Sequence, residues 1–523
     1  MTLSIQIMRR NFNLLRLRVP LYLAAFLAVA TGKAADTSNE AIAPIYAPFA
    51  MPQLVRPVFP ARTFNIRDYG AVEGGVVKNT DAFAKAIDAC SKLGGGKVVV
   101  PAGRWLTGPI HLKSNIDLHL EEGAEVIFSD KFADYLPPVL VRDGGIEIYN
   151  YSPLIYARDC QNIAVTGPGL LTGNGNAWWA WKNVPKGQSF QMAAEGVPVE
   201  KRVFGTPEAG IRPSFVSFVN CKNVLLEGFT ITSGPGWTIH PIYCENVIVR
   251  RVHVDTHGPN NDGMDPDSCR NVLVEYCTFR TGDDCLVLKS GYNEDGWRVN
   301  KPTENVVMRY CSATQGHGGL VIGSEMSGGV RNVYMHDCEF DGTDHAVRIK
   351  SRPDRGGYIE NVWVENVKGK NLQHEAVILS MSYGSDKIPI ASRKPPIFRD
   401  MQIKNLTVDG APAAILITGL EDSLVSNIRF ENVAISSLKG VIASNATGLV
   451  FDSVKIAPSA GPEFDFDNVS QSLIRNAGGP PAGRPFLKVK GKASAGIRIE
   501  GSNIPEDAVE IGADAPANAV SMP

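Results

Sequence analysis

The stretches NVLL at residues 223–226, NVIV at 246–249 and NVLV at 271–274 decide the fold of this chain. Each begins with asparagine and continues as a short apolar segment rich in β-branched side chains, which is typical of a buried strand. Further copies begin at Asn162, Asn305, Asn332 and Asn361, and weaker ones at Asp400, Asn427 and Gly448. The repeat predicts a chain made of similar, stacked units.

The spacing of the copies indicates how these units are arranged. From residue 223 to residue 448 the successive steps are 23, 25, 34, 27, 29, 39, 27 and 21 residues. Periods of about 20 to 50 residues are typical of stacked repeat proteins. Several short strands per step, with no helix between them, predict an all-β, single-domain parallel β-helix in which the longer steps carry inserted loops.

The cysteines follow the same register. Four lie two residues before a copy and three lie six residues after one: Cys160, Cys221, Cys244 and Cys269, then Cys277, Cys311 and Cys338. Equivalent positions of neighbouring coils lie about 4.8 Å apart. We therefore predict two interior columns of thiols, with disulfides as the alternative that an exported chain of nine cysteines leaves open.

The N-terminus has the pattern of an export signal. Residues 1–34 contain four arginines, an apolar run over residues 19–30 and the small-x-small sequence Gly32-Lys33-Ala34. Twelve apolar residues are too few for a membrane span, which needs about 20. The pattern predicts a signal peptide, and a protein secreted to the periplasm or the extracellular space.

Removing residues 1–34 leaves 47 basic and 54 acidic residues, a net charge of 47 − 54 = −7. This balance disfavours a nucleic-acid partner. An anionic substrate would need basic groups concentrated in a cleft.

The mature chain divides into three predicted parts. Residues 35–62, rich in proline and alanine, form an extended lead-in, residues 63–460 form the β-helix, and residues 461–523 form a C-terminal cap or a loosely ordered tail. A short amphipathic helix with Asn79 or Thr80 as its N-cap is expected to cover the open end of the first coil.

Charged residues recur at one place in consecutive coils. Counted from the asparagines, Asp262 lies at +16, Asp283 and Asp284 at +12 and +13, His317 at +12, and Arg348 and Lys350 at +16 and +18. A single Asp-Gly pair is most often a turn. Aligned instances in adjacent coils predict instead a functional site on one face.

The residue types indicate the chemistry. Carboxylates held close together raise the pKa of at least one of them, which supplies a general acid, and glycoside hydrolysis uses such pairs. Arg348 and Lys350, two residues apart on a strand, point to the same face and suit the carboxylate of an acidic sugar. We expect neither a metal nor a cofactor.

These motifs resemble glycoside hydrolase family 28, the polygalacturonases. The matching segments are Asn260-Asn261-Asp262-Gly263-Met264-Asp265, Gly282-Asp283-Asp284-Cys285, Gly316-His317-Gly318 and Arg348-Ile349-Lys350, and the resemblance covers roughly residues 60–460. It departs at Asn261, where many members have threonine; this position lies between the motif's fixed residues.

The resemblance implies a right-handed parallel β-helix and inverting hydrolysis of α-1,4-linked galacturonate in pectin. It implies Asp283 as general acid, Asp262 and Asp284 as activators of water, and His317 as a residue that tunes the acid or touches the sugar. Arg348 and Lys350 would hold the galacturonate carboxylate, and Tyr383 resembles a subsite tyrosine.

Two features bear on the cleavage pattern. Residues 212–241 resemble bacterial, exo-acting members, and an insertion over residues 167–215 contains Trp178, Trp179 and Trp181. The insertion is placed to close one end of the cleft, although aromatic clusters in loops more often serve packing.

Two other functions remain open. One is a Ca²⁺-dependent, pectate-lyase-like β-elimination, which leaves His317 and the Asp283-Asp284 pair without clear roles. The other is a non-catalytic, glycan-binding β-helix. The expected partner is pectin or an oligogalacturonide, with no nucleic acid, and we expect a monomer.

Overall fold

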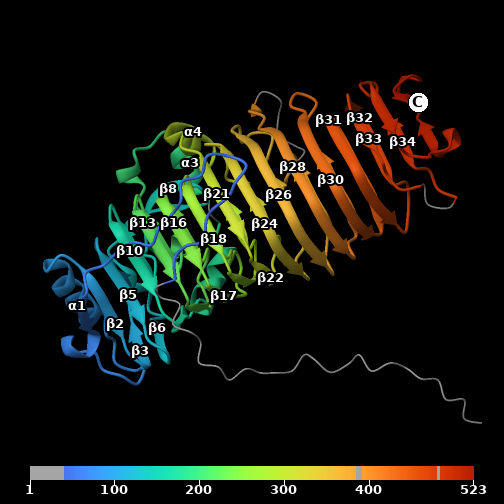
Figure 1. Cartoon of the computed structure of the whole chain (residues 1–523). Helices are drawn as coiled ribbons and strands as arrows, with labels where there is room; N and C mark the ends of the chain where they lie inside the picture. Colours follow the sequence, from blue (N-terminus) through green and yellow to red (C-terminus); the bar gives the residue numbers. More distant parts are fainter. Residues whose placement is uncertain (1–39, 186, 385–391, 480–482, 523) are drawn as a thin grey trace, which may run out of the picture. The chain divides into compact units, whose positions relative to one another are not determined.

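The computed structural model describes residues 40–185, 187–384, 392–479 and 483–522 (Figure 1). The predicted signal peptide lies outside the described residues. The chain divides into residues 1–40 and a larger unit, residues 41–523, which holds every element named below.

The predicted coils are present as a parallel β-helix, whose strands run side by side in Figure 1. The asparagine-led segments form one series of parallel strands, in which Val224, Val247, Val272 and Val306 are aligned as neighbours. The series comprises β2 (Gly96–Val100), β5 (Ile116–Leu120), β10 (Gln161–Thr166), β13 (Lys222–Glu227), β16 (Glu245–Arg250), β18 (Arg270–Glu275), β21 (Thr303–Arg309), β24 (Val330–Asp341), β26 (Tyr358–Lys370), β28 (Ile397–Asp409), β30 (Val425–Ser437) and β31 (Lys439–Pro458).

Two further series complete each coil. The second comprises β3 (Gly103–Thr107), β6 (Ala124–Phe128), β11 (Leu170–Thr172), β14 (Thr230–Thr232), β17 (His253–Thr256), β19 (Thr278–Thr281) and β22 (Ser312–Gln315). The third comprises β4 (Ile110–His111), β9 (Ile155–Arg158), β12 (Val216–Val219), β15 (Ile239–Ile242), β20 (Leu286–Leu288), β23 (Leu320–Ile322), β25 (Val347–Lys350), β27 (Glu375–Ser380) and β29 (Ala413–Thr418). From β24 onward a single long strand covers the first and second series. Side chains of all three series fill one continuous apolar core.

The asparagines that begin the copies have a structural role that explains the residue type. They adopt left-handed backbone angles, with φ between 53° and 58° from Asn162 to Asn361, a conformation that asparagine tolerates better than most residues. Their side-chain amides also bond to one another from coil to coil, at 3.0 to 3.3 Å, in an unbroken ladder from Asn361 to Asn115.

The outward-facing residue two places after each asparagine determines where the lead-in lies. This column reads Ala164, Leu225, Ile248, Leu273, Val307, Tyr334, Trp363 and Gln402. Residues 42–59 pack against its apolar part, with Leu54 buried there. Arg56 forms an ion pair with Glu227, and Arg309 donates to the carbonyl of Pro44 at 2.8 Å. The lead-in therefore covers an apolar stripe that would otherwise face water.

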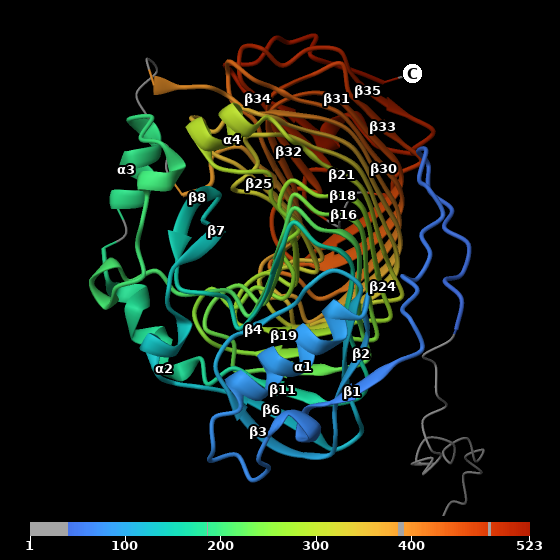
Figure 2. The ribbon, with the colours of Figure 1, turned by 90° about the vertical axis from the view of Figure 1, so that its left-hand side faces the viewer.

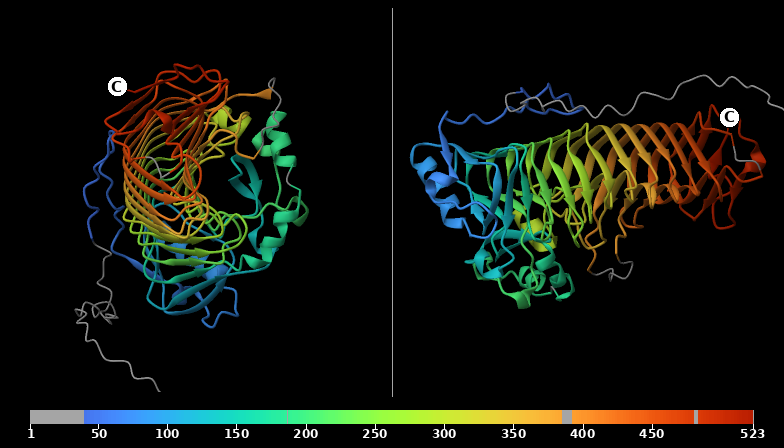
Figure 3. Two further views of the ribbon diagram at one scale, coloured as in Figure 1. Left: turned by 90° about the vertical axis from the view of Figure 1, so that its right-hand side faces the viewer. Right: turned by 90° about the horizontal axis from the view of Figure 1, so that it is seen from below.

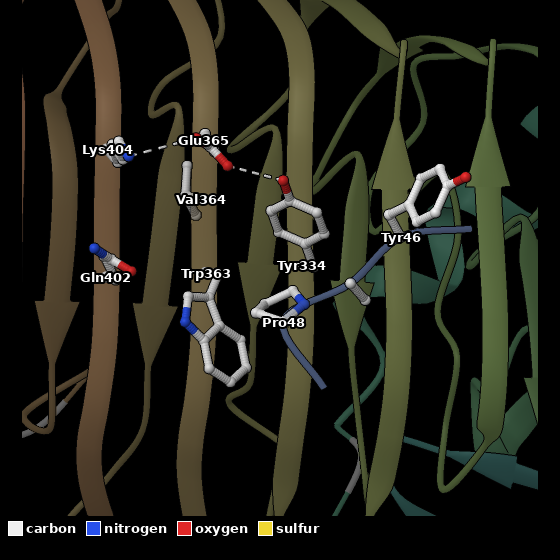
Figure 4. A pocket seen from close by; sticks show the side chains of 9 residues that line it. Tyr46, Pro48, Tyr334, Trp363, Val364, Glu365, Gln402 and Lys404 are labelled. Carbon is white, nitrogen blue, oxygen red and sulfur yellow. Dashed lines mark hydrogen bonds and ion pairs between the residues drawn. The ribbon is translucent and has the colours of Figure 1, made fainter. Parts of the chain in front are cut away.

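A cavity of about 280 Å³ lies where the lead-in passes the end of this stripe (Figure 4). Tyr46, Tyr334 and Trp363 line it together with Glu365 and Lys404. The Tyr334 hydroxyl donates to Glu365 at 2.9 Å, and Lys404 lies 3.9 Å from the same carboxylate. Beyond Trp363 the column turns polar, which accounts for the place where the covering ends.

Helix α1 (Thr80–Lys92) covers the first coils, as Figure 2 shows. Phe83, Ala86 and Ile87 enter the main core. The expectation of a side-chain N-cap is corrected: Asn79 holds the N-cap position, but its side chain bonds to Val72 and to neighbouring carbonyls and makes no cap bond. The Thr80 hydroxyl accepts from the Gly108 amide at 2.7 Å.

The C-terminal part extends the stack past residue 460, where the sequence analysis placed its end. Its strands are β32 (Phe464–Ser470), β33 (Leu473–Arg475), β34 (Leu487–Lys490), β35 (Ile497–Glu500), β36 (Val509–Ile511) and β37 (Val520–Ser521), all paired in parallel. Strands this short, separated by Gly- and Pro-rich turns, leave little periodic signal in the sequence.

All nine cysteines are free thiols, and all except Cys160 are buried. The two thiol columns are confirmed: Cys160, Cys221, Cys244 and Cys269 interact in one, and Cys277, Cys311 and Cys338 in the other. The disulfide alternative is wrong.

The insertion over residues 167–215 folds onto one side of the coils, green in Figures 2 and 3. It contains α2 (Asn176–Trp179) and α3 (Gln188–Ala194), and the hairpin of β7 (Val139–Asp143) and β8 (Ile146–Asn150) lies beside it. Trp178 and Trp181 are buried against Phe132 and Tyr151, so both serve packing. Within the described part of the chain, no helix is long and apolar enough to cross a membrane.

Candidate active site

The predicted site residues come together on one face, at the turns that lead into the third strand series. Asp262 lies just before Met264, which bridges β15 and β20, and the Asp283-Asp284 pair lies between β19 and β20. His317 lies between β22 and β23, and Arg348 and Lys350 lie on β25. Parallel register from β20 to β25 places these turns in neighbouring coils.

Asp283 and His317 form a hydrogen-bonded pair. Nδ1 of His317 lies 2.9 Å from Oδ1 of Asp283. This bond to Asp283 raises the pKa of His317 despite its partial burial. Burial opposes ionisation of Asp283, but the His317 bond and charge, with the charges of Lys350 and Lys289, outweigh it and hold the pKa of Asp283 below its usual value. Both shifts favour a proton on the imidazole over one on the carboxyl.

Asp284 is held by two cations. Oδ1 accepts from Arg348 at 3.0 Å and Oδ2 accepts from Lys350 at 2.7 Å. The carboxylate is almost fully buried, which would favour its neutral form, yet the charge of Lys350 and then that of Arg348 keep its pKa lowered. Asp284 is therefore an ionised carboxylate fixed in position.

Asp262 has the opposite electrostatic character. It is 2% exposed, and its Oδ1 has no hydrogen-bond partner among the described residues. Burial, together with the negative charge of Asp283, raises the pKa of Asp262 well above its ordinary value. Among the three predicted carboxyls, the one with a raised pKa is thus Asp262 and not Asp283.

Tyr383 joins the same face. Its ring lies 5.5 Å from the guanidinium carbon of Arg348 and 5.0 Å from Nζ of Lys350, distances at which a cation interacts with an aromatic ring. The ring is 40% exposed. It therefore borders the open side of the two cations, where a sugar ring can contact it.

A buried ion pair of Lys289 and Glu325, which the sequence did not predict, lies near the carboxylates. Nζ of Lys289 donates to Glu325 at 2.7 Å and to the carbonyl of Gly323 at 3.1 Å. Burial disfavours the charge of Lys289, but Glu325 first and then Asp262 and Asp265 raise its pKa. Asp265, fully buried, has a raised pKa through burial and the charge of Asp262. Lys289 thus provides positive potential below Asp262.

Asn260, the first residue of the Asn260–Asp265 motif, contacts Asp283 directly. Its Nδ2 donates to Oδ2 of Asp283 at 3.3 Å, while its Oδ1 accepts from Lys182 at 2.7 Å and from Arg212 at 2.8 Å. Lys182 and Arg212 belong to the insertion. No local sequence pattern places them here, because a long, irregular loop brings them to the site.

The ligand atoms of Asp283, Asp284 and His317 lie within 4.8 Å of one another, a spacing that a metal ion can bridge. The two cations already on Asp284 oppose a third positive charge, and Nδ1 of His317 is engaged with Asp283. The donor set therefore fits a proton-transfer site better than a metal site.

Comparison with known proteins supports the family resemblance that the sequence motifs show. Residues 90–448 match the family described as glycosyl hydrolases family 28. The crystal structure of a hyperthermoactive exopolygalacturonase from Thermotoga maritima is 41% identical, with a TM-score of 0.70, over 75% of this chain and 89% of that one. An exo-poly-alpha-D-galacturonosidase from Dickeya chrysanthemi is 28% identical over 76% of this chain and 72% of its own length. A probable polygalacturonase from Vitis vinifera is 27% identical over 72% and 74%, respectively.

Proposed function

The chain belongs to glycosyl hydrolases family 28 and is a polygalacturonase-type hydrolase, and we propose that it removes galacturonate from galacturonan chain ends with inversion at the anomeric carbon. The observation that carries the mechanism is the asymmetry of the adjacent carboxylates. Asp283 is hydrogen-bonded to the imidazole of His317, while Asp284 is bonded to two cations.

Asp283 is assigned as the general acid that protonates the glycosidic oxygen. The bond to His317 favours a proton on the imidazole, and the charge of Lys350 also lowers the pKa of Asp283. A galacturonate carboxylate bound at Arg348 and Lys350 brings a negative charge that offsets this positive field. The pKa of Asp283 then rises, and the proton moves along the 2.9 Å bond from Nδ1 to Oδ1.

Asp284 and Asp262 are assigned to the attacking water. Asp284, ionised and fixed, accepts a proton from the water as it attacks the anomeric carbon. Asp262, whose pKa is raised by burial and by the charge of Asp283, lies beside Asp284 and is assigned to orient that water. Direct attack by water forms the new C–O bond on the face opposite the departing sugar, so the configuration inverts.

Arg348 and Lys350 are assigned to the substrate carboxylate, with Tyr383 beside them. Both cations also hold Asp284, so a carboxylate bound to them lies next to the group that activates water. Exo action is supported by the insertion, which reaches the catalytic residues through Lys182 and Arg212. Secretion to the periplasm or the extracellular space is proposed from the pattern of residues 1–34.

Digestion of polygalacturonate by the wild type and by Asp283→Asn tests the proposal. The wild type should release reducing sugar, with monomeric galacturonate appearing first. Asp283→Asn should lower kcat by about 10²-fold to 10⁴-fold with a smaller change in KM, because general acid catalysis contributes on that order. An unchanged rate in a folded Asp283→Asn variant would show that Asp283 is not the general acid, and no release of sugar by the wild type would favour the non-catalytic, glycan-binding function.

The same digestion separates hydrolysis from elimination. A product absorbing in the ultraviolet, lost on addition of a chelator, would show the Ca²⁺-dependent lyase reaction. Hydrolysis gives saturated products at a rate that a chelator does not alter.

A further inference from the structure

The insertion brings two cations to the active site, and neither has a carboxylate partner in the part of the chain that the structure describes. Arg212 is 7% exposed and donates to the carbonyls of Pro235 and Pro259 and to the amide oxygen of Asn260. Lys182 is exposed and donates to the same amide oxygen. Among the described residues, neither forms an ion pair, and Nε of Arg212 has no partner.

This arrangement leaves positive charge uncompensated at the site. Burial lowers the pKa of Arg212, and the acidic groups that counter this effect, Asp143, Asp262 and Asp283, lie beyond ion-pair distance. Asp262 has a raised pKa and Asp283 is matched by His317. A buried cation that is paired only with neutral oxygens is costly unless an anion reaches it.

The order of contacts along the stack shows where such an anion would lie. Asp283 contacts Asn260 through one oxygen and His317 through the other. Asn260, which lies toward the N-terminal coils, accepts hydrogen bonds from Lys182 and Arg212. His317 lies in the next coil, just before β23, and β23 pairs with β25, the strand that carries Arg348 and Lys350. Two pairs of cations therefore flank the acid on opposite sides.

We propose that Lys182 and Arg212 form a second carboxylate site, which binds the galacturonate on the other side of the scissile bond from the one held by Arg348 and Lys350. The inference rests on the proposed function, since an α-1,4-linked pair of uronates carries one carboxylate on each side of the glycosidic oxygen. Lys182 and Arg212 share one acceptor, the amide oxygen of Asn260, so both lie within reach of a single carboxylate.

The second site also accounts for terminal cleavage. The cations stand on the insertion, and Trp179 of the same insertion donates from its indole nitrogen to the carbonyl of Gly234 at 2.9 Å, which fixes this wall to the coil beneath. A galacturonate bound to Lys182 lies against the wall, so it is the end unit of the chain.

The test is steady-state hydrolysis of digalacturonate and trigalacturonate by Lys182→Met, Lys182→Arg and the control Lys201→Met. Lys201 is another exposed lysine of the insertion, outside the site. Lys182→Met should raise KM about tenfold or more, equivalent to about 1.4 kcal/mol, with kcat within about threefold. Lys182→Arg should retain most of the affinity, Lys201→Met should match the wild type, and added salt should raise KM less in Lys182→Met than in the wild type.

An unchanged KM in Lys182→Met would overturn the inference. So would a loss of kcat at constant KM, because Lys182 would then act only by positioning Asn260 against Asp283. Failure of the proposed function has a different signature: the wild type itself would release no galacturonate from either substrate.

Discussion

At the scale of single residues, the site depends on the two cations that balance the negative charge of Asp284. Its two oxygens are bonded to Arg348 and Lys350, and the burial that would favour a neutral carboxyl is overcome by these charges. The same two cations are proposed to bind the substrate. One pair of side chains therefore sets both the affinity for an acidic sugar and the ionisation state of the carboxylate that accepts the water's proton.

Replacing Lys350 separates these effects. In Lys350→Met, Asp284 loses the largest influence that lowers its pKa, so its pKa rises. Because Asp284 must be ionised to accept a proton, activity is present above this pKa and is lost as the pH falls through it. The acidic limb of the kcat/KM profile should therefore move to higher pH, and KM for galacturonan should rise about tenfold or more.

The matched control is Lys404→Met, on the outer face of the stack and in contact with Glu365. It should leave both the pH profile and KM unchanged. An acidic limb that stays in place in Lys350→Met would show that Asp284 is not the group that limits activity at low pH.

At the scale of structural elements, the asparagine ladder fixes the start of each strand of the first series. Asn305 lies within it: its Nδ2 donates to Asn271 at 3.0 Å, its Oδ1 accepts from Asn332 at 3.1 Å, and its φ is 58°. Asparagine thus serves two purposes: it adopts the left-handed backbone angle, and its side chain forms a hydrogen bond to each neighbouring coil.

Two substitutions at this position distinguish the purposes. Asn305→Gly keeps the backbone angle and removes both side-chain hydrogen bonds, each of which contributes about 0.5 to 1.5 kcal/mol to the free energy of unfolding. Asn305→Ala also forces alanine into the left-handed region, at about 1 to 2 kcal/mol. Both should unfold at lower urea concentration than the wild type, and the alanine variant at the lower of the two. Equal midpoints would mean that the turn adds no backbone preference.

The elements that the sequence predicted are those with a repeated pattern. The asparagine-led strands, the thiol columns and α1 follow from apolar periodicity, and each has a counterpart in the structure. The β7–β8 hairpin and helices α2 and α3 each occur once, so no repeat indicates them. The coils after residue 460 were missed because strands such as Leu473–Arg475 are too short to show an alternation.

At the scale of the whole molecule, one column of residues connects the fold to the lead-in. The outward position is apolar from Ala164 to Trp363 and polar at Gln402. Residues 42–59 cover the apolar part and leave the side that carries the insertion uncovered (Figure 2). The repeat shows which residues face outward, but the lead-in has no pattern of its own that indicates its partner.

The catalytic residues could be predicted because they recur at fixed distances from the asparagines. The residues that tune them could not, since Lys289 and Glu325 meet only through coil stacking and Lys182 reaches Asn260 only through the fold of the insertion. Positions counted from the asparagines also do not indicate which carboxyl has the raised pKa. That depends on the pairing of Asp283 with His317 and of Asp284 with two cations, and on the lack of a cationic partner for Asp262 among the described residues.

The anomeric configuration of the first product tests the central claim most directly. In a proton NMR time course of polygalacturonate digestion, direct attack of water held by Asp284 and Asp262 should release galacturonate as the β-anomer, before mutarotation, with no unsaturated sugar. Initial release of the α-anomer would contradict the single-displacement assignment of the three aspartates, and an unsaturated product would contradict hydrolysis itself.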